Sequence, residues 1–262
     1  MTAGTARGAR RSEFCTQTAH AYRFDWGPSG LRALAPASAV VVIVDVLRFT
    51  SAVSAAIESH ATVYPYPWAD SGAGDYAAQR GATLAGLREH GGPSLSPTDL
   101  LTLAAGSRIV LPSPNGSALA FAAHAHGTCH VLAGCFRNAT ATAREARRLA
   151  DGGGIAVIAA GERWHGATGP IRPAVEDLLG AGAVLAALDP SASLSAPNCS
   201  PEAAAARAAF VAARPHLFHA LAESSSGQEL IARGWDDDVA TCAALDVTDS
   251  AAVLIDEAFV AS

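Results

Sequence analysis

Residues 39–51 read AVVVIVDVLRFTS, and this stretch decides the fold expected for the chain. Its five consecutive β-branched residues, 40–44, are typical of a strand that is buried on both faces of a sheet. Thr50 and Ser51 then open an alanine-rich run, which predicts the start of a helix. Asp45 and Arg48 are therefore expected at the carboxyl end of a core strand, where α/β proteins place their ligands.

The same order of a short strand followed by an alanine-rich helix recurs three times. The pairs are 108–111 with 115–126, 130–133 with 138–150, and 155–159 with 173–188. Other segments are expected as an edge strand with a turn (14–34), short strands (61–66 and 83–86), a surface loop (87–97) and a closing strand (253–260). This alternation predicts an α/β fold whose parallel strands are joined by helical crossovers and end at one edge of the sheet.

Composition limits the class of protein. With 262 residues, of which 50% are hydrophobic and 16% charged, we expect a single α/β domain over residues 14–262, preceded by a flexible leader over residues 1–13. A net charge of −6 provides no basic surface for nucleic acid, and no stretch reaches the roughly 18 apolar residues of a membrane span. Five scattered cysteines favour reduced thiols and a cytoplasmic location.

Missing residues and motifs exclude several kinds of catalysis. All 18 basic residues are arginines, which excludes a Schiff-base lysine, a P-loop lysine and the lysine of haloacid-dehalogenase-type phosphatases. The sequence contains no Cys-x5-Arg phosphatase loop, no Gly-x-Ser-x-Gly elbow and no glycine fingerprint of a dinucleotide-binding fold. An anion is therefore expected to be bound by arginines, backbone amides or a metal.

Small, polar or charged residues follow each of the four main predicted strands. Helix N-termini at this edge would direct unpaired N–H groups into a shared crevice, which suits an anion. The candidates for this crevice are Asp45, Arg48, Asn115, Gly116, Ser117 and Asn138. Helix capping by the two asparagines, turn geometry for the glycine and a structural Asp45–Arg48 ion pair are the alternatives.

Three further acids are candidates for a metal site. Glu162 follows the fourth strand, and Glu176 and Asp177 are adjacent near the start of a predicted helix. The side chains of Glu176 and Asp177 would project about 100° apart, so at most one faces squarely into a single site. Such carboxylates suit a hard cation such as Mg²⁺, and compensation of the helix dipole is the alternative.

A serine run that ends in glycine, residues 224–227, is a second candidate anion-binding turn. It precedes a helix-like segment, so a plain helix cap and linker is the alternative.

Taken together, the motifs resemble those of the 2-phosphosulfolactate phosphatases. The resemblance rests on their order between residues 40 and 246: Asp45-Val46-Leu47-Arg48 with Thr50, Asn115-Gly116-Ser117 with Ala118-Leu119, Gly134 with Asn138, Ala160-Gly161, Glu176-Asp177 with Ala181-Gly182, Ser224 to Gly227, Gly234, Asp237, and Cys242-Ala243 with Asp246. It implies a three-layer α/β/α sandwich around a mixed, largely parallel sheet. It also implies Mg²⁺-dependent hydrolysis of 2-phospho-3-sulfolactate to sulfolactate on a coenzyme M route, by a homodimer.

For this chain the resemblance implies a division of roles. Mg²⁺ would be held by Asp45 with Glu176 or Asp177, and in addition by Glu162; Asp45 is equally a candidate base or nucleophile. Arg48 would hold a phosphate oxygen, and the neutral donors would be Asn115, Gly116, Ser117 and Asn138. The carboxylate or sulfonate end of a small anionic phosphorylated substrate would lie at Ser225, Ser226 and Gly227.

The sequence departs from the family pattern at residues 86–88, 95–97 and 114–117, where a substrate would be selected. Two alternatives therefore stay open: another class of enzyme that acts on an anionic acid, and a non-catalytic anion-binding homologue.

Overall fold

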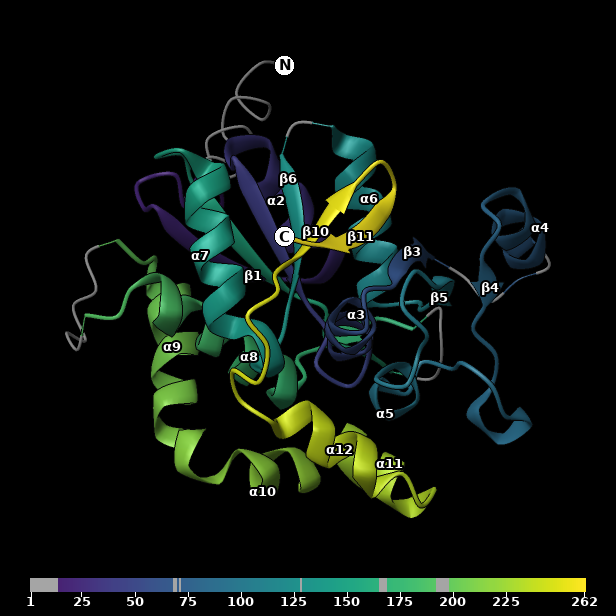
Figure 1. Ribbon diagram of the computed structural model, residues 1–262. Coiled ribbons are helices and arrows are strands. Elements are labelled where there is room, and N and C mark those ends of the chain that lie inside the picture. The colour runs from purple at the N-terminus through teal and green to yellow at the C-terminus, as the bar shows by residue number, and fades with distance from the viewer. Residues whose placement is uncertain (1–13, 68–69, 71, 128, 165–168, 192–197) are drawn as a thin grey trace, which may run out of the picture.

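The computed structural model describes residues 14–67, 70, 72–127, 129–164, 169–191 and 198–262. Its centre is a nine-stranded sheet with the strand order β1-β7-β2-β6-β10-β11-β3-β5-β4 (Figure 1). Strands β8 and β9 form a separate small hairpin. The strands are β1 (Tyr22–Trp26), β2 (Val40–Val44), β3 (Thr62–Tyr66), β4 (Thr83–Leu84), β5 (Arg108–Pro112), β6 (His130–Gly134), β7 (Ile155–Ala159), β8 (Glu162–Arg163), β9 (Ile171–Arg172), β10 (Ala252–Ile255) and β11 (Ala258–Ala261).

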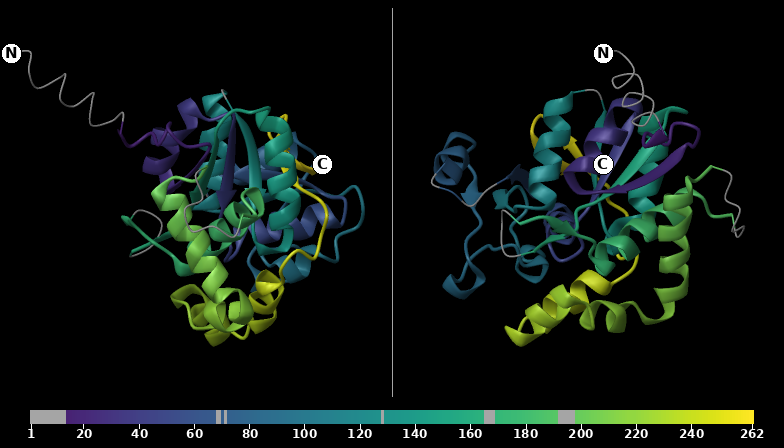
Figure 2. Two further views of the ribbon diagram at one scale, coloured as in Figure 1. Left: turned by 90° about the vertical axis from the view of Figure 1, so that its left-hand side faces the viewer. Right: turned by 180° about the vertical axis from the view of Figure 1, so that it is seen from behind.

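Strand β2 contributes to two hydrophobic cores, one on each face of the sheet. Val40, Val42 and Val44 pack into one core, and Val41 and Ile43 into the other. The first core includes helices α7 (Ala139–Ala150), α8 (Val175–Leu188) and α9 (Pro201–Ala213). The second includes α2 (Gly27–Leu34), α3 (Phe49–Glu58) and α6 (Gly116–His126), and Figure 2 shows both layers. The predicted α/β fold and the three-layer sandwich are confirmed.

The C-terminal segment differs most from the predicted fold. Residues 253–260 do not form one closing strand, because they belong to a hairpin, β10–β11, that is inserted between β6 and β3. Three successive antiparallel pairings reverse the strand direction, so β3, β5 and β4 run opposite to β1, β7, β2 and β6. The sheet is thus mixed and mostly parallel, in two halves of opposite direction.

The end of β5 nevertheless lies close to the end of β2. The backbone N–H of Gly116, at the start of α6, donates to the Asp45 carboxylate over 2.8 Å. Adjacent strands are rotated by about 20–25°, so the steps from β2 to β5 accumulate roughly 100–125° of twist. A rotation of that size reduces the separation that the reversal creates, and residues 113–115 connect β5 to Gly116. The prediction that all strand ends share one parallel edge is therefore wrong, although the side chains meet.

Two smaller predictions are also corrected. Residues 27–34, expected as a turn, form helix α2, which has a proline in its first turn. The loop expected at 87–97 contains a short 3-10 helix, η2 (Arg88–His90), and a bridge between Gly86 and Ser94, and it leads into α5 (Pro97–Leu100). The predicted leader over residues 1–13 lies outside the described residues, and the single domain over 14–262 stays a prediction.

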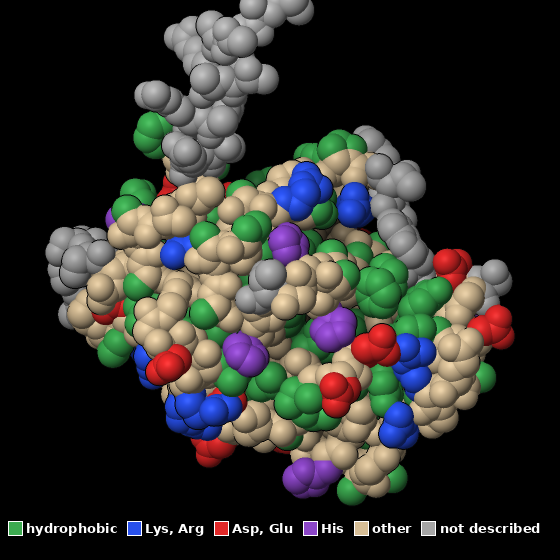
Figure 3. Space-filling view, turned by 90° about the horizontal axis from the view of Figure 1, so that it is seen from above, with side chains coloured by type: hydrophobic (Ala, Val, Ile, Leu, Met, Phe, Trp, Pro, Cys, Tyr) green, Lys and Arg blue, Asp and Glu red, His purple; other side chains and the backbone are tan. Residues whose placement is uncertain are grey.

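The C-terminal helices cover the end of the molecule at which β2 stops (Figure 1). They are α10 (Leu217–Ala222), α11 (Ser225–Ala232) and α12 (Asp236–Ala243). On the described part of the opposite end, side chains of both charge signs are interspersed (Figure 3). Cys129, Cys135, Cys199 and Cys242 are free thiols. Within the described ranges, no helix combines the length and the apolar character that a membrane crossing requires.

Candidate active site

Asp45 follows β2 directly and is almost completely buried. Its Oδ1 accepts the N–H of Phe49 over 3.2 Å, and its Oδ2 accepts the N–H of Gly116 over 2.8 Å. A Cβ atom at position 116 would lie 2.6 Å from that Oδ2, so only glycine allows this approach. The backbone at two helix starts therefore fixes the orientation of the Asp45 carboxylate.

The four predicted metal-site acids gather around this point. The pKa of Asp45 is raised to about 6, chiefly because the carboxyl group is buried, and the charges of Glu162 and Glu176 add to the effect. Burial and the charges of Asp45 and Glu176 also raise the pKa of Asp177 well above its usual range. In the part of the chain that the structure describes, no arginine or histidine forms an ion pair with any of the four. The cluster therefore has no ion-pair partner among the described residues.

Only two of the four acids face open space. Asp45 and Glu162 line a cavity of about 200 Å³, which we call the carboxylate cavity. Asp177 instead lies behind it, where its two oxygens accept the N–H groups of Val46 and Gly161 over 2.7 and 2.9 Å. Glu176 is buried and does not line the cavity. Both adjacent acids thus point into the protein, and Asp177 tethers β7 to the segment after β2.

Asn115 connects this cavity to the β8–β9 hairpin. Its Nδ2 donates to Glu162 Oε1 over 2.9 Å, and its side chain makes no capping bond to α6. The helix-cap alternative for Asn115 is therefore wrong. Its Oδ1 is buried and, among the described residues, has no hydrogen-bond partner.

The donor atoms around the carboxylate cavity fit Mg²⁺. Asp45, Glu162 and the unpartnered Asn115 Oδ1 are all oxygen donors, the type that this hard cation prefers. Within the described residues, no group of three or more histidine, cysteine, aspartate or glutamate side chains is placed to hold a metal by itself. Proteins usually hold Mg²⁺ by one or two carboxylates, with water and substrate phosphate completing the shell, and a cavity lined by Asp45 and Glu162 matches that pattern.

Arg48 also lines the carboxylate cavity and does not pair with Asp45. Its Nη1 is 2.5 Å from Asp238 Oδ2, and its guanidinium carbon is 4.9 Å from the ring centroid of Trp235. The structural Asp45–Arg48 ion pair is therefore wrong. The peptide bond between Leu47 and Arg48 is cis.

Asp238 was not among the predicted site residues. It is completely buried, and besides Arg48 it binds Ser96 Oγ over 2.5 Å and Arg88 Nη1 over 3.2 Å. Arg88 also makes two hydrogen bonds to Asp237, of 3.1 and 2.7 Å. The run Trp235-Asp236-Asp237-Asp238 was visible in the sequence, but its partners lie about 140 to 190 residues away.

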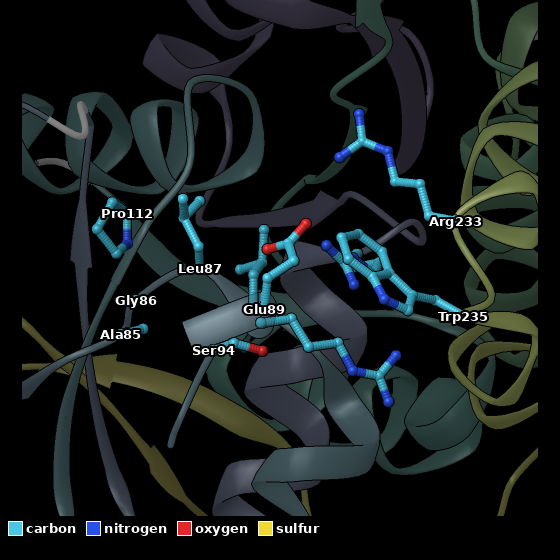
Figure 4. A pocket seen from close by; sticks show the side chains of 11 residues that line it. Ala85, Gly86, Leu87, Glu89, Ser94, Pro112, Arg233 and Trp235 are labelled. Carbon is cyan, nitrogen blue, oxygen red and sulfur yellow. The ribbon is translucent and has the colours of Figure 1, made fainter. Parts of the chain in front are cut away.

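A second cavity, of about 310 Å³, adjoins the first. It lies between the segment 85–95 and the turn that joins α11 to α12, from which Arg233 and Trp235 project into it (Figure 4). We call it the arginine cavity because Arg48, Arg88 and Arg233 line it. The two cavities share Arg48, Leu95, Arg233 and Trp235.

Two predicted neutral donors are buried and line neither cavity. Asn138 is completely buried; its Oδ1 accepts the N–H of Cys135 over 3.0 Å and its Nδ2 donates to Ala133 O over 3.1 Å. Asn138 therefore stabilises the turn after β6 and lines neither cavity. Ser117 is also buried, and its Oγ has no partner among the described residues.

The serine run is mainly a helix cap. Ser224 Oγ accepts the N–H of Gly227 over 3.0 Å at the start of α11, and Gly227 is buried. Ser225 is exposed outside both cavities, whereas Ser226 lines the carboxylate cavity. Of the three predicted residues, only Ser226 reaches the site.

Comparison with known proteins agrees with this arrangement. No curated protein matches the chain. The family model described as 2-phosphosulpholactate phosphatase matches residues 30–257, which include β2, both cavities and the C-terminal helices. The chain therefore belongs to the 2-phosphosulpholactate phosphatase family, which is a family of phosphoric monoester hydrolases.

Proposed function

We propose that this protein is a Mg²⁺-dependent phosphatase that hydrolyses 2-phospho-3-sulfolactate, or a related small phosphorylated hydroxy acid, to sulfolactate and inorganic phosphate. One observation carries the proposal beyond family membership: Asp45 and Glu162, which have no ion-pair partner among the described residues, line the same cavity as Arg48. Phosphoryl transfer requires positive charge and exact positioning around the phosphate more than covalent chemistry by the protein. This cavity offers a place for both.

Each residue of the cavity has a definable task. Asp45 and Glu162 would hold Mg²⁺, which when bound supplies charge neutralisation at the phosphate oxygens. The Gly116 N–H orients Asp45, and the Asn115 amide orients Glu162. Arg48 donates to a phosphate oxygen, for which a planar guanidinium is well suited.

Arg48 has donors available for this task although it is ion-paired. A guanidinium group carries five N–H bonds, and the hydrogen bond to Asp238 uses only Nη1. Because Asp238 is completely buried and fixed by Ser96, it holds Arg48 in one orientation before substrate arrives. A preorganised donor needs little rearrangement when charge develops on the transferred phosphoryl group.

A panel of hydroxy-acid phosphates tests the function. We expect inorganic phosphate to be released from 2-phospho-3-sulfolactate, activity to be lost after exhaustive EDTA treatment, and activity to return with Mg²⁺. Turnover of a substrate without phosphate release would support another enzyme class. Thermal stabilisation by the substrates without any turnover would support a non-catalytic anion-binding homologue.

Activity that survives EDTA treatment would contradict the metal requirement but leave the phosphatase intact. The coenzyme M route and a homodimer are parts of the proposal that rest on the family resemblance, and the cytoplasmic location rests on the five scattered cysteines. The dimer is tested by light scattering of the purified protein, in which a single monomer mass would contradict it.

A further inference from the structure

Asp177 joins two segments that are far apart in the sequence. It lies in the first turn of α8, and its side chain is buried behind the carboxylate cavity. Its Oδ1 accepts the N–H of Val46 over 2.7 Å, and its Oδ2 accepts the N–H of Gly161 over 2.9 Å. Both oxygens of one carboxylate are therefore used to hold backbone, and each holds a different segment.

Each of these N–H groups belongs to the neighbour of a cavity carboxylate. Val46 directly follows Asp45, and Gly161 directly precedes Glu162. The two segments leave the sheet from the neighbouring strands β2 and β7, and Asp177 bonds them just beyond the point where the parallel pairing of these strands ends. Asp177 therefore bridges the backbone at the two places from which Asp45 and Glu162 enter the cavity.

Close packing of α8 against the end of β2 keeps this carboxylate in place. Gly180 lies one turn after Asp177, on the same side of the helix. A Cβ atom at position 180 would lie 2.4 Å from Val46 Cγ2 and 3.0 Å from Val44 Cγ1, so a glycine is required for this approach. The helix is thus fixed against the same segment that Asp177 bonds, which leaves the carboxylate little freedom to move.

The burial of Asp177 is better explained by geometry than by stability. No basic side chain among the described residues forms an ion pair with it, and a carboxylate without such a partner is unfavourable in the interior of a protein. The two backbone N–H groups offset part of that cost. An apolar side chain would fill the same space without the cost, but it could not hold the two N–H groups.

We propose that Asp177 is a positioning residue of the metal site, which fixes the spacing between Asp45 and Glu162 by holding the backbone beside each of them. The inference rests on the proposed function, in which these two carboxylates hold Mg²⁺, and it gives Asp177 a role other than that of a metal ligand. Two carboxylates at a fixed spacing bind a cation without first having to be brought together. Loss of the tether should therefore weaken Mg²⁺ binding although both ligands remain.

Calorimetric titration of the full-length protein with Mg²⁺ measures this effect without any turnover. We expect Asp177→Asn to raise the Kd for Mg²⁺ roughly tenfold, as is typical when a residue that supports a metal ligand is changed. The asparagine keeps one acceptor oxygen, but its NH2 group faces the second backbone N–H and cannot accept it. At saturating Mg²⁺ the variant should regain most of its kcat, because Asp45, Glu162 and Arg48 are still present.

Two control variants separate the tether from other effects of removing a buried acid. Glu176→Gln removes the adjacent buried charge but neither of the two backbone hydrogen bonds, so it should weaken Mg²⁺ binding less than Asp177→Asn does. Glu145→Gln removes a buried, ion-paired acid of α7 that lines neither cavity, so it should leave the Kd unchanged even if it lowers the transition temperature. Equal weakening by Glu176→Gln, or an unchanged Kd in folded Asp177→Asn, would overturn the inference and leave the phosphatase standing.

Amide hydrogen exchange of the wild-type protein tests the same inference if Asp177→Asn does not fold. We expect the amide protons of Val46 and Gly161 to exchange slowly both without and with Mg²⁺, because Asp177 holds them before the metal binds. Protection that appears only with Mg²⁺ would overturn the inference, and so would protection that is lost when Mg²⁺ binds, since Asp177 would then have turned to the metal. Absence of any Mg²⁺ binding by the wild-type protein would instead overturn the metal requirement of the proposed function, and the positioning role with it.

Discussion

The four carboxylates and the three arginines of the site are held by opposite means. Asp45 and Asp177 receive backbone N–H groups and have no basic partner among the described residues. Arg48 and Arg88 are instead paired with acids on α12, which comes from the C-terminal part of the chain. The orientation of the carboxylates is therefore fixed although no basic side chain is paired with them. Arg48 and Arg88 already have acidic partners before any ligand binds.

This difference predicts where the site is sensitive. Loss of an arginine should remove a contact to substrate. Loss of the buried acid that pairs with the arginines should also reduce folding stability. The stability of the carboxylate cluster should depend on pH and on cations. The following predictions test these three responses in order of expected size.

Arg48→Ala should have the largest effect, a fall in kcat/KM of roughly 10²–10³, because a preorganised donor to the transferred phosphoryl group is lost. Steady-state phosphate release measures it, with Arg214→Gln as the control for removal of an arginine. A folded Arg48→Ala protein with wild-type kcat/KM would show that Arg48 does not contact the transferred group.

Asp238→Asn should lower the free energy of unfolding by about 3 kcal/mol, because two guanidinium groups lose the buried carboxylate that they share. Urea denaturation measures the change. Asp237→Asn is the matched control. The Asp237 side chain is 47% exposed and binds Arg88 but not Arg48, so the free energy of unfolding should fall by about 1 kcal/mol or less. Equal losses in the two variants would contradict the central role of Asp238.

The metal-free protein should lose stability as the pH rises from about 4 to about 6. The pKa of Asp45 rises from 3.8 to about 6 on folding, so the folded state binds more protons in this window and its advantage disappears as they leave. The raised pKa of Asp177 extends the decline in the same direction. The transition temperature of thermal unfolding, recorded against pH in the presence of EDTA, measures this loss of stability.

Mg²⁺ should reverse this decline above pH 6, because a cation stabilises the ionised carboxylates. Asp45→Ala should flatten the slope between pH 4 and 6, since the titrating group is removed. A transition temperature that is constant from pH 4 to 8 in the wild-type protein without metal would contradict an uncompensated carboxylate cluster.

Ser225→Ala should have the smallest effect, within about twofold in kcat/KM and about 0.5 kcal/mol in stability, because the side chain is exposed outside both cavities. The same substitution at Ser226, which lines the carboxylate cavity, should have the larger effect on KM. A substantial loss of activity in Ser225→Ala alone would place the substrate nearer to the start of α11 than we propose.

Much of the fold could be predicted because the signals are local. Five β-branched residues in a row leave little alternative to a strand buried on both faces, and the structure packs alternate residues of β2 into separate cores. The β10–β11 hairpin could not be predicted in this way. Its turn residues, Asp256 and Glu257, adopt φ values of 46° and 70° without the Asn-Gly pair that usually marks such turns.

The candidate site likewise contains residues that the sequence predicted and residues that it did not. Asp45, Arg48, Asn115 and Glu162 line the carboxylate cavity, and each follows a strand end that the sequence pattern reveals. Asp238 was missed because it lies at no predicted strand end, and Arg88 was missed because residues 87–97 were predicted as a surface loop. Their importance arises from contacts between segments 149 and 190 residues apart.

The amino-acid sequence by itself determined the buried strand, the alternation of strands and helices, the absence of lysine and the residues at the strand ends. These properties depend on neighbours a few residues apart, where periodicity and side-chain type act directly. Only the tertiary structure decided the reversal of half the sheet, the pairing of Arg48 with Asp238 in place of Asp45, and the formation of two adjoining cavities. Those depend on which distant segments pack together, because burial and ion pairing are properties of the assembled core.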